Sequence, residues 1–196
     1  MRGSGPMTTE TEGRRGAGPV PSSDGAGLAQ ALRRIEVRQG AVEVSSRSDT
    51  ELAATLGSCV AVCLHDPAHG MGGMNHIFRC LDPGPAGGGA IVAEMERLVN
   101  SLVRLGSRRT GLRARVIGGA HVLLRGRDVG SEIAGTCLLY LAAERIPVLE
   151  CTTGGERARR ALFRPATGHF ELSYPGGPIP ARRAPSMPPG EDCTLF

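Results

Sequence analysis

Apolar and polar residues alternate along residues 35–45, IEVRQGAVEVS, and a glycine interrupts the alternation at position 40. A period of two is typical of half-buried strands, so we predict a strand pair there. The apolar run CVAVCL at 59–64 is continuous and is bounded by glycine and Asp-Pro, as expected of a strand buried on both faces. MGGMNHIF, residues 71–78, is its predicted return strand.

Two later segments carry apolar residues at helical spacing. The first is IVAEMERLVNSLVRLG, which begins at residue 91 and has Gly106 as its stop signal. Its inward positions are predicted to be Ile91, Met95, Leu98, Val99, Leu102 and Leu105. A second helix is predicted to begin after Ser131. Its inward positions are predicted to be Ile133, Cys137, Leu138 and Leu141.

Four more segments have strand patterns: RARVIGGA (113–120), RIPVLECTTGG (145–155), RRALFRP (159–165) and GHFELSY (168–174). About six or more strands with flanking helices, and no regular alternation of strand and helix, predict a mixed α+β layer fold rather than a doubly wound sheet. We expect a single domain over residues 31–174. Residues 1–30 and 175–196 are rich in Gly, Pro and Arg and are predicted to be tails, the first of them disordered.

The composition excludes several kinds of chemistry. The 23 cationic residues are all arginine, so neither a Schiff-base lysine nor a Walker phosphate loop is possible. Aromatic residues make up 3% of the chain, which leaves few platforms for stacking bases beside a net charge of +4. We therefore predict no nucleic-acid partner, and an acidic protein partner fits the charge at least as well. Arg157, Arg159 and Arg160 are candidates for that contact, although a solvated cationic edge explains them equally well.

The six cysteines lie mostly in apolar runs and do not suggest a disulfide scaffold. No secretory signal is visible, and IAGTCLLYLAA, the longest uncharged apolar run, is too short to cross a bilayer. We expect a reduced, soluble, cytoplasmic protein without membrane insertion.

The segment LGSCVAVCLHDPAHGMGGMNH, residues 56–76, contains a candidate site. If it forms a hairpin with its turn centred between Pro67 and Ala68, Cys59 lies opposite His76, with Cβ atoms roughly 4.5–5.5 Å apart. The backbone at Gly57 and Ser58 could then offer N–H groups to an oxyanion, and Gly72-Gly73 could leave room for a substrate. A neighbouring imidazolium would lower the pKa of the thiol.

Two other interpretations of this segment stay open on the residues alone. A cysteine in an apolar strand is usually a packing residue. A metal site would draw on two thiols and three imidazoles, but five groups strung along one hairpin do not converge readily on a tetrahedron. These groups belong to Cys59, Cys63, His65, His69 and His76.

The same segment resembles the signature of the chemoreceptor glutamine deamidase family, CheD, with its GSC-V-x-V strand, Asp-Pro turn and GGM-x-H return strand. Four further matches follow in order: RVIGGAHV (115–122), VG (129–130), TGGERARR (153–160) and ATGHFEL (166–172). The resemblance spans roughly residues 35–174. It implies a cysteine hydrolase with a fold similar to deamidating toxin domains, which converts glutamines of methyl-accepting chemoreceptors to glutamate.

By this resemblance Cys59 is the nucleophile, His76 is the general base and acid, and no metal or organic cofactor is needed. A CheC-type phosphatase is the second implied partner. The family commonly has a threonine six residues before the cysteine, where this chain has Ala53. We expect Thr55, at the same strand parity, to orient His76 instead. The alternative is a weak or inactive adaptor that binds receptors or the phosphatase.

Overall fold

The computed structural model describes residues 31–78, 86–122 and 128–175, and these ranges contain nine strands, two α-helices and one short 3-10 helix. The first elements are β1 (Arg33–Glu36), β2 (Val42–Ser45), β3 (Thr50–Leu56), β4 (Val60–Asp66) and β5 (Met71–Asn75). The others are α1 (Ala86–Leu105), η1 (Arg109–Gly111), β6 (Arg113–Gly118), α2 (Val129–Ala143), β7 (Val148–Thr153), β8 (Arg159–Arg164) and β9 (His169–Ser173). The predicted α+β class is confirmed.

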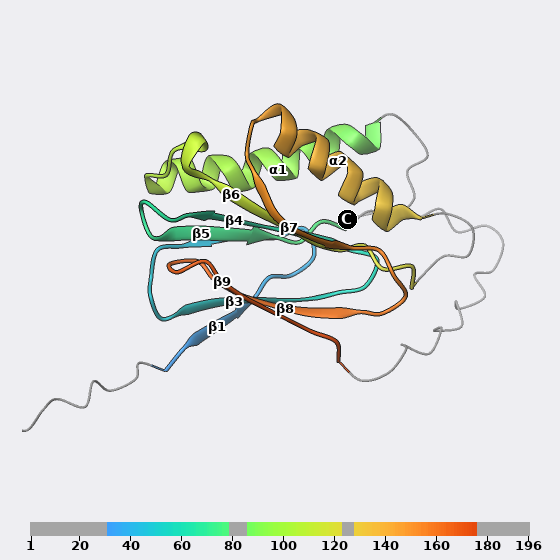
Figure 1. Ribbon diagram of the computed structural model, residues 1–196, viewed down its shortest axis with the longest axis horizontal. Coiled ribbons are helices and arrows are strands. Elements are labelled where there is room, and N and C mark those ends of the chain that lie inside the picture. The colour runs from blue at the N-terminus through green and yellow to red at the C-terminus, as the bar shows by residue number, and fades with distance from the viewer. Residues whose placement is uncertain (1–30, 79–85, 123–127, 176–196) are drawn as a thin grey trace, which may run out of the picture. The chain divides into compact units, whose positions relative to one another are not determined.

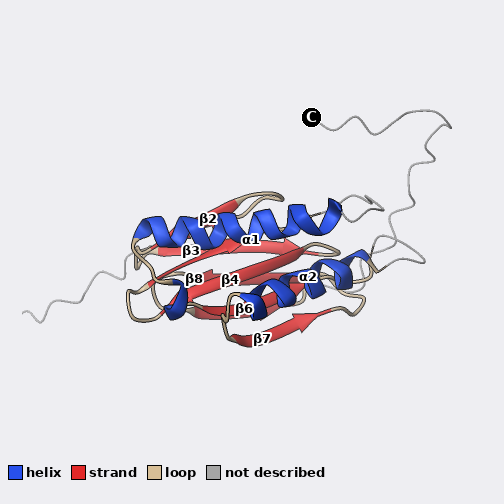
Figure 2. Cartoon of the chain, turned by 90° about the horizontal axis from the view of Figure 1, so that it is seen from above, coloured by secondary structure: helices blue, strands red, loops and turns tan. Residues whose placement is uncertain are grey.

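The elements form three layers (Figure 1). A five-stranded sheet in the order β2-β5-β4-β6-β7 lies in the middle, and a four-stranded sheet in the order β1-β3-β8-β9 covers one of its faces. Both helices lie side by side across the other face, as the view from above shows (Figure 2). The connection from β6 through α2 to β7 is the kind of crossover that parallel neighbours require.

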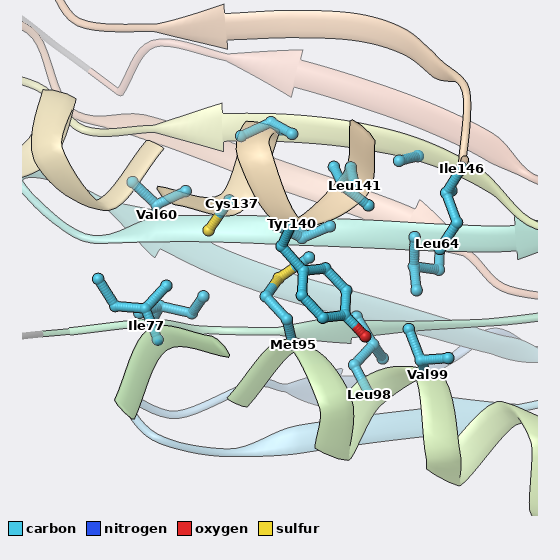
Figure 3. Packing of buried hydrophobic residues seen from close by; sticks show 14 of the residues in the cluster. Val60, Leu64, Ile77, Met95, Leu98, Val99, Cys137, Tyr140, Leu141 and Ile146 are labelled. Carbon is cyan, nitrogen blue, oxygen red and sulfur yellow. The ribbon is translucent and has the colours of Figure 1, made fainter. Parts of the chain in front are cut away.

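Strand β4 lies at the centre of the five-stranded sheet, and its alternate residues serve two separate cores. Val60, Val62 and Leu64 pack under the helices, as Figure 3 shows for the first and last of them. Cys59, Ala61 and Cys63 face the four-stranded sheet. The continuous apolar run therefore forms a strand buried on both faces, as predicted. Its period of two also turns the thiol of Cys59 away from the helices.

Both helices extend beyond their predicted starts. Helix α1 begins at residue 86, and its predicted inward positions are buried except Leu105, which is 40% exposed in the last turn. Helix α2 begins at Val129 because the carboxylate of Asp128 accepts a hydrogen bond from the N–H of Ser131 at 2.9 Å. Asp128, rather than Ser131, is the N-cap.

The predicted strand pair at 35–45 is wrong as a pair. Strand β1 lies in the four-stranded sheet beside β3, and β2 lies in the five-stranded sheet beside β5. The chain therefore crosses between the sheets at residues 37–41 and crosses back at residues 46–49 between β2 and β3. It crosses again at residues 57–59 between β3 and β4 and at residues 154–158 between β7 and β8. Strand β3 had no clear sequence signal because its residues 50–54 are all buried, which removes the alternation.

The β4–β5 hairpin forms, but its register differs from the prediction. Asp66 pairs with Met71 and Cys63 with Met74, so the turn is centred one residue later, between Ala68 and His69. Extending this register to the isolated bridge between Val60 and Ile77 places His76 opposite Ala61.

The predicted tails lie outside the described residues, apart from Pro175, and the proposed domain boundaries stay predictions. Neither described helix combines the length and the apolar character that a membrane span requires.

Candidate active site

Two of the four connections between the sheets meet at Cys59. This residue ends the connection from β3 to β4 and is buried, with 5% of its surface exposed. Gln39 lies in the first connection, and its side-chain Nε2 donates to Sγ of Cys59 at 3.5 Å. The thiol therefore lies at the end of the interface between the sheets, under the amide of a residue 20 positions earlier.

His76 follows β5 and is held by a main-chain group. Its Nδ1 lies 2.9 Å from the carbonyl oxygen of Val37. A carbonyl only accepts hydrogen bonds, so in the neutral ring Nδ1 carries the proton and Nε2 presents its lone pair. That Nε2 is buried and has no hydrogen-bond partner among the described residues. An unpaired, buried imidazole nitrogen in the base form can take a proton from a neighbouring group.

The turn at residues 38–41 also holds the backbone of His76. The N–H of Gly40 donates to the carbonyl of His76 at 2.8 Å, and the N–H of His76 donates to the carbonyl of Ala41 at 3.1 Å. Gly40 has a φ of +73°, which closes the turn and favours glycine. The N–H of Val37 in turn donates to the carbonyl of Ala53 at 2.8 Å. The first connection is thereby fixed to both sheets.

Asn75 breaks the β4–β5 ladder immediately before His76. Its side-chain Oδ1 accepts from the N–H of Val62 at 2.8 Å, in the place that a strand carbonyl would take. Its Nδ2 contacts the sulfur of Met95 at 3.6 Å. The main-chain groups of His76, the next residue, point to the other side of β5, where they bond to Ala41 and Gly40 in the turn before β2.

The sequence predicted that Cys59 and His76 lie directly opposite each other, and the structure shows that they do not. The shift of the turn by one residue changes the register by two, so both side chains still lie on the face toward the four-stranded sheet, as diagonal neighbours. The Cβ atoms of diagonal neighbours in a sheet lie up to roughly 7–8 Å apart. In structures without substrate, catalytic hydrogen bonds are often long and shorten when substrate binds.

Burial keeps both groups neutral. It raises the pKa of the Cys59 thiol above its usual value of 9.0, although hydrogen bonds from Gln39 and from the backbone N–H of Cys59 oppose the effect. Burial also lowers the pKa of His76 below 6.5, against the opposing effect of the Val37 carbonyl. The predicted lowering of the thiol pKa by an imidazolium is therefore not found in this structure.

Three glycines bring a loop close to the backbone of Cys59. The N–H of Gly119 donates to the carbonyl of Cys59, and that of Ala120 to the carbonyl of Gly57, both at 2.7 Å. A Cβ at Gly118 would lie 2.2 Å from the oxygen of Cys59, and one at Gly130 would lie 2.5 Å from Gly119. The GGA and VG motifs thus allow the start of α2 and this loop to pack against the segment that carries the thiol.

The structure places Gly57 and Ser58 next to the thiol, at the sharp turn that the sequence predicted. Because N–H and C=O of a trans peptide point in opposite directions, the Ser58 N–H points away from Ala120, which holds the Gly57 carbonyl. The oxyanion role of these two residues stays a prediction.

Thr55 does not lie near His76, so its expected role needs correction. Leu52, Ala54 and Leu56 face the five-stranded sheet, and strand alternation turns Thr55 to the opposite, exposed face. There its Oγ1 accepts a hydrogen bond from Arg160 at 3.0 Å. The Val37 carbonyl occupies the orienting position instead. No sequence pattern had marked Val37, because the contact uses its main chain.

Gly72 and Gly73 do not open room for a substrate. A Cβ on Gly72 would lie 2.6 Å from the oxygen of Leu64 and 3.0 Å from the ring of Phe163. A Cβ on Gly73 would lie 2.6 Å from the side chain of Val44. These glycines permit close packing of β5 between its neighbours.

The arginines of TGGERARR have separate environments. Arg159 is buried and donates to the carbonyls of Gly118, Thr152 and Gly154, which fixes the loop at 152–155 beside β6. Arg160 pairs with Glu36. Only Arg157 of the three is exposed, with its guanidinium 5.1 Å from the ring centre of Tyr174. The prediction that all three arginines contact an acidic partner is therefore wrong.

The other imidazoles of the hairpin are not gathered around Cys59. Nδ1 of His69 lies 2.7 Å from the carboxylate of Asp66, which also accepts from the hydroxyl of Ser107 at 2.6 Å. Burial opposes ionisation of Asp66, but these hydrogen bonds lower its pKa to about 2. In the described part of the chain, no three His, Cys, Asp or Glu side chains are grouped as metal ligands. His121 is exposed and lies 3.6 Å from the carboxylate of Asp128.

Comparison with known proteins identifies the family. The model of the family described as "CheD chemotactic sensory transduction" matches residues 91–174. A Rhizobium rhizogenes protein named probable chemoreceptor glutamine deamidase CheD is 41% identical over 153 residues, covering 76% of this chain and 83% of its own length. The chain belongs to the CheD family. A CheD relative of the same name from Agrobacterium fabrum is 40% identical over 141 residues and covers 70% of this chain and 78% of its own. Another CheD relative with this name, from Caulobacter sp., is 37% identical over 165 residues and covers 80% and 87%.

The segment that the CheD family model matches contains GGA, VG and TGG, which pack or fix the surroundings of Cys59. Cys59, His76 and the turn that holds them lie before it. Their chemical roles therefore depend on the geometry of this chain.

Proposed function

We propose that this protein is a chemoreceptor glutamine deamidase in which Cys59 is the nucleophile and His76 is the general base and acid. The observation that carries the proposal is the buried, unpaired Nε2 of His76, on the same sheet face as the Cys59 thiol. The relatives named as probable chemoreceptor glutamine deamidases support the substrate class.

The reaction begins with a neutral pair. Nε2 of His76 takes the thiol proton as Sγ of Cys59 bonds to the carboxamide carbon of the substrate, and the carbonyl oxygen becomes an oxyanion. When the C–N bond breaks, His76 gives this proton to the nitrogen, and ammonia leaves behind a thioester. Neutral His76 then takes a proton from water, whose oxygen attacks the thioester. The C–S bond breaks, the proton on His76 returns to sulfur, and the carboxylic acid that forms releases its own proton to solvent to become the carboxylate.

The Val37 carbonyl fixes the tautomer and direction that each of these steps requires. Ala53 had favoured an inactive adaptor, because the expected threonine is missing there. In this chain the Ala53 carbonyl supports Val37, and Val37 orients the ring. The absence of a threonine hydroxyl at position 53 is therefore compatible with turnover.

Mass spectrometry of a cytoplasmic chemoreceptor fragment, incubated with the purified protein, tests the proposal. Each converted glutamine should add roughly 1 Da, because an amide nitrogen is replaced by an acid oxygen in the hydrolysis. Cys59→Ser and His76→Ala should abolish the change. Cys151→Ser, which alters an exposed cysteine on β7, is the matched control and should keep it. Folded wild-type protein that changes none of several receptor fragments would rule the proposal out.

The CheC-type phosphatase partner and the cytoplasmic location remain predictions. Binding to a purified phosphatase of that type, measured with the Cys59→Ser variant, tests the first independently of turnover. Fractionation of cells that express the full chain tests the second.

A further inference from the structure

Gln39 is positioned to act on the reaction from outside the Cys–His pair. Its side chain is exposed, whereas the sulfur that it contacts belongs to a buried residue. The amide of Gln39 therefore connects the exposed surface of the turn to the buried Sγ. The N–H group of that amide, the only end that can donate, points at the sulfur.

The turn that carries Gln39 is held at both ends. The N–H of Ala41 donates to the carbonyl of Arg38 at 2.9 Å, which closes the turn around Gln39 and Gly40. Gly40 donates to His76 within the same turn, and Val37 before it orients the imidazole. One short segment thus fixes the direction of the base and the origin of the Gln39 side chain together.

We propose that Gln39 is a catalytic residue whose Nε2–H donates to the oxyanion when Cys59 attacks the substrate carboxamide. The oxyanion is two bonds from Sγ, so a donor 3.5 Å from the sulfur reaches it after a small side-chain movement. Side-chain amides serve as such donors because they are neutral and stay protonated at nitrogen at every relevant pH.

This inference rests on the proposed function, because an oxyanion forms only if Cys59 attacks a carbonyl or carboxamide. It also explains why an amide, and no carboxylate or cation of the residues that the structure describes, acts on the thiol. A charged group at position 39 would change the pKa of the thiol, whereas an amide stabilises the developing charge on oxygen and leaves the resting thiol neutral.

The experiment compares wild type, Gln39→Met and Arg38→Met. Methionine keeps the length of glutamine but cannot donate, and Arg38 is an exposed neighbour in the same turn, which makes its variant the matched control. Three quantities are measured: kcat/KM on a chemoreceptor fragment, the rate of Cys59 alkylation by iodoacetamide, and the affinity for a peptide whose glutamine carboxamide is replaced by an aldehyde. Alkylation forms no oxyanion, whereas the aldehyde adds the thiol and places an oxygen at that position.

Gln39→Met should lower kcat/KM by about 10²–10³-fold and weaken aldehyde binding, with alkylation changed by less than about threefold, and Arg38→Met should match wild type. Unchanged turnover would overturn the inference. If turnover and alkylation both increase in Gln39→Met, the side chain only shields the thiol, and the inference is overturned. If both decrease, Gln39 only positions the thiol, and the inference is overturned as well.

If the wild-type protein converts no receptor fragment but binds the aldehyde, and Gln39→Met weakens that binding, the proposed substrate is refuted and the role of Gln39 is retained. Wild type that neither binds the aldehyde nor converts a fragment would overturn both.

Discussion

The carbonyl oxygen of Val37 lies 2.9 Å from Nδ1 of His76, across 39 positions of the sequence. This contact joins the connection between β1 and β2 to the end of β5. It assigns the imidazole tautomer by chemistry, because an acceptor at Nδ1 leaves Nε2 as the base. In the proposed mechanism, this main-chain group orients the imidazole as a third side chain does in catalytic triads.

A distortion of the turn at residues 38–41, which follows Val37 and carries Gln39, should lower turnover by more than the accompanying loss of stability explains. Gly40→Ala meets no atom within 4 Å, so its cost comes from the φ of +73°, about 1–2 kcal/mol. We expect a lower Tm and a kcat/KM reduced tenfold or more, since roughly that loss follows from a misplaced base or donor. Gly70→Ala, at a φ of +58° in the β4–β5 turn, is the control and should lower Tm similarly without the loss of turnover. Equal kcat/KM in the two variants would contradict the role of the turn.

Replacement of the threonine near the nucleophile should have little effect on turnover. Thr55→Ala removes a hydroxyl that accepts from Arg160 on the exposed face of β3, so the free energy of unfolding should fall by about 0.5 kcal/mol or less. Deamidation kinetics and chemical denaturation measure the two quantities. A loss of turnover of tenfold or more would mean that Thr55 reaches His76 in a conformation that this structure does not show.

The pH dependence should be that of a neutral pair. Protonated His76 cannot accept the thiol proton, so kcat/KM should fall as the pH decreases through the pKa of His76, which burial sets below 6.5. The fall should therefore lie at lower pH than it would for an unperturbed imidazole. Alkylation of Cys59 by iodoacetamide requires the thiolate and should continue to rise above pH 9.0, because burial raises the thiol pKa. Alkylation that is already maximal at neutral pH would indicate a preformed ion pair.

The start of α2 should tolerate no side chain beside the loop under Cys59. Gly130→Ala would place a Cβ 2.5 Å from the backbone of Gly119, so that loop or the helix must move. We expect a lower Tm together with a lower kcat/KM. Gly135→Ala on the same helix meets nothing within 4 Å and should instead stabilise the protein by up to about 1 kcal/mol. Thermal denaturation and turnover of the two variants provide the comparison, and an active, stable Gly130→Ala protein would be the contrary result.

The family, the fold class and the pair of candidate catalytic side chains followed from local features of the sequence. The run at 59–64 had to be a strand buried on both faces, because no residue in it tolerates solvent well. The Asp-Pro turn had to return the chain beside it, and even with the register shifted by two residues the period of two kept Cys59 and His76 on one face. Parity survives such a shift, whereas direct opposition does not.

What the sequence could not determine depends on contacts between distant backbone segments. The alternation at 35–45 predicted two strands but not that they belong to different sheets, because alternation reports one buried face and not which layer covers it. Only the tertiary structure brings the Val37 carbonyl to His76 and the Gln39 amide to Cys59. A carbonyl is common to every residue and an amide side chain is common on surfaces, so neither leaves a pattern in the sequence. Their proposed roles arise where two of the connections between the packed sheets, at residues 37–41 and 57–59, come together.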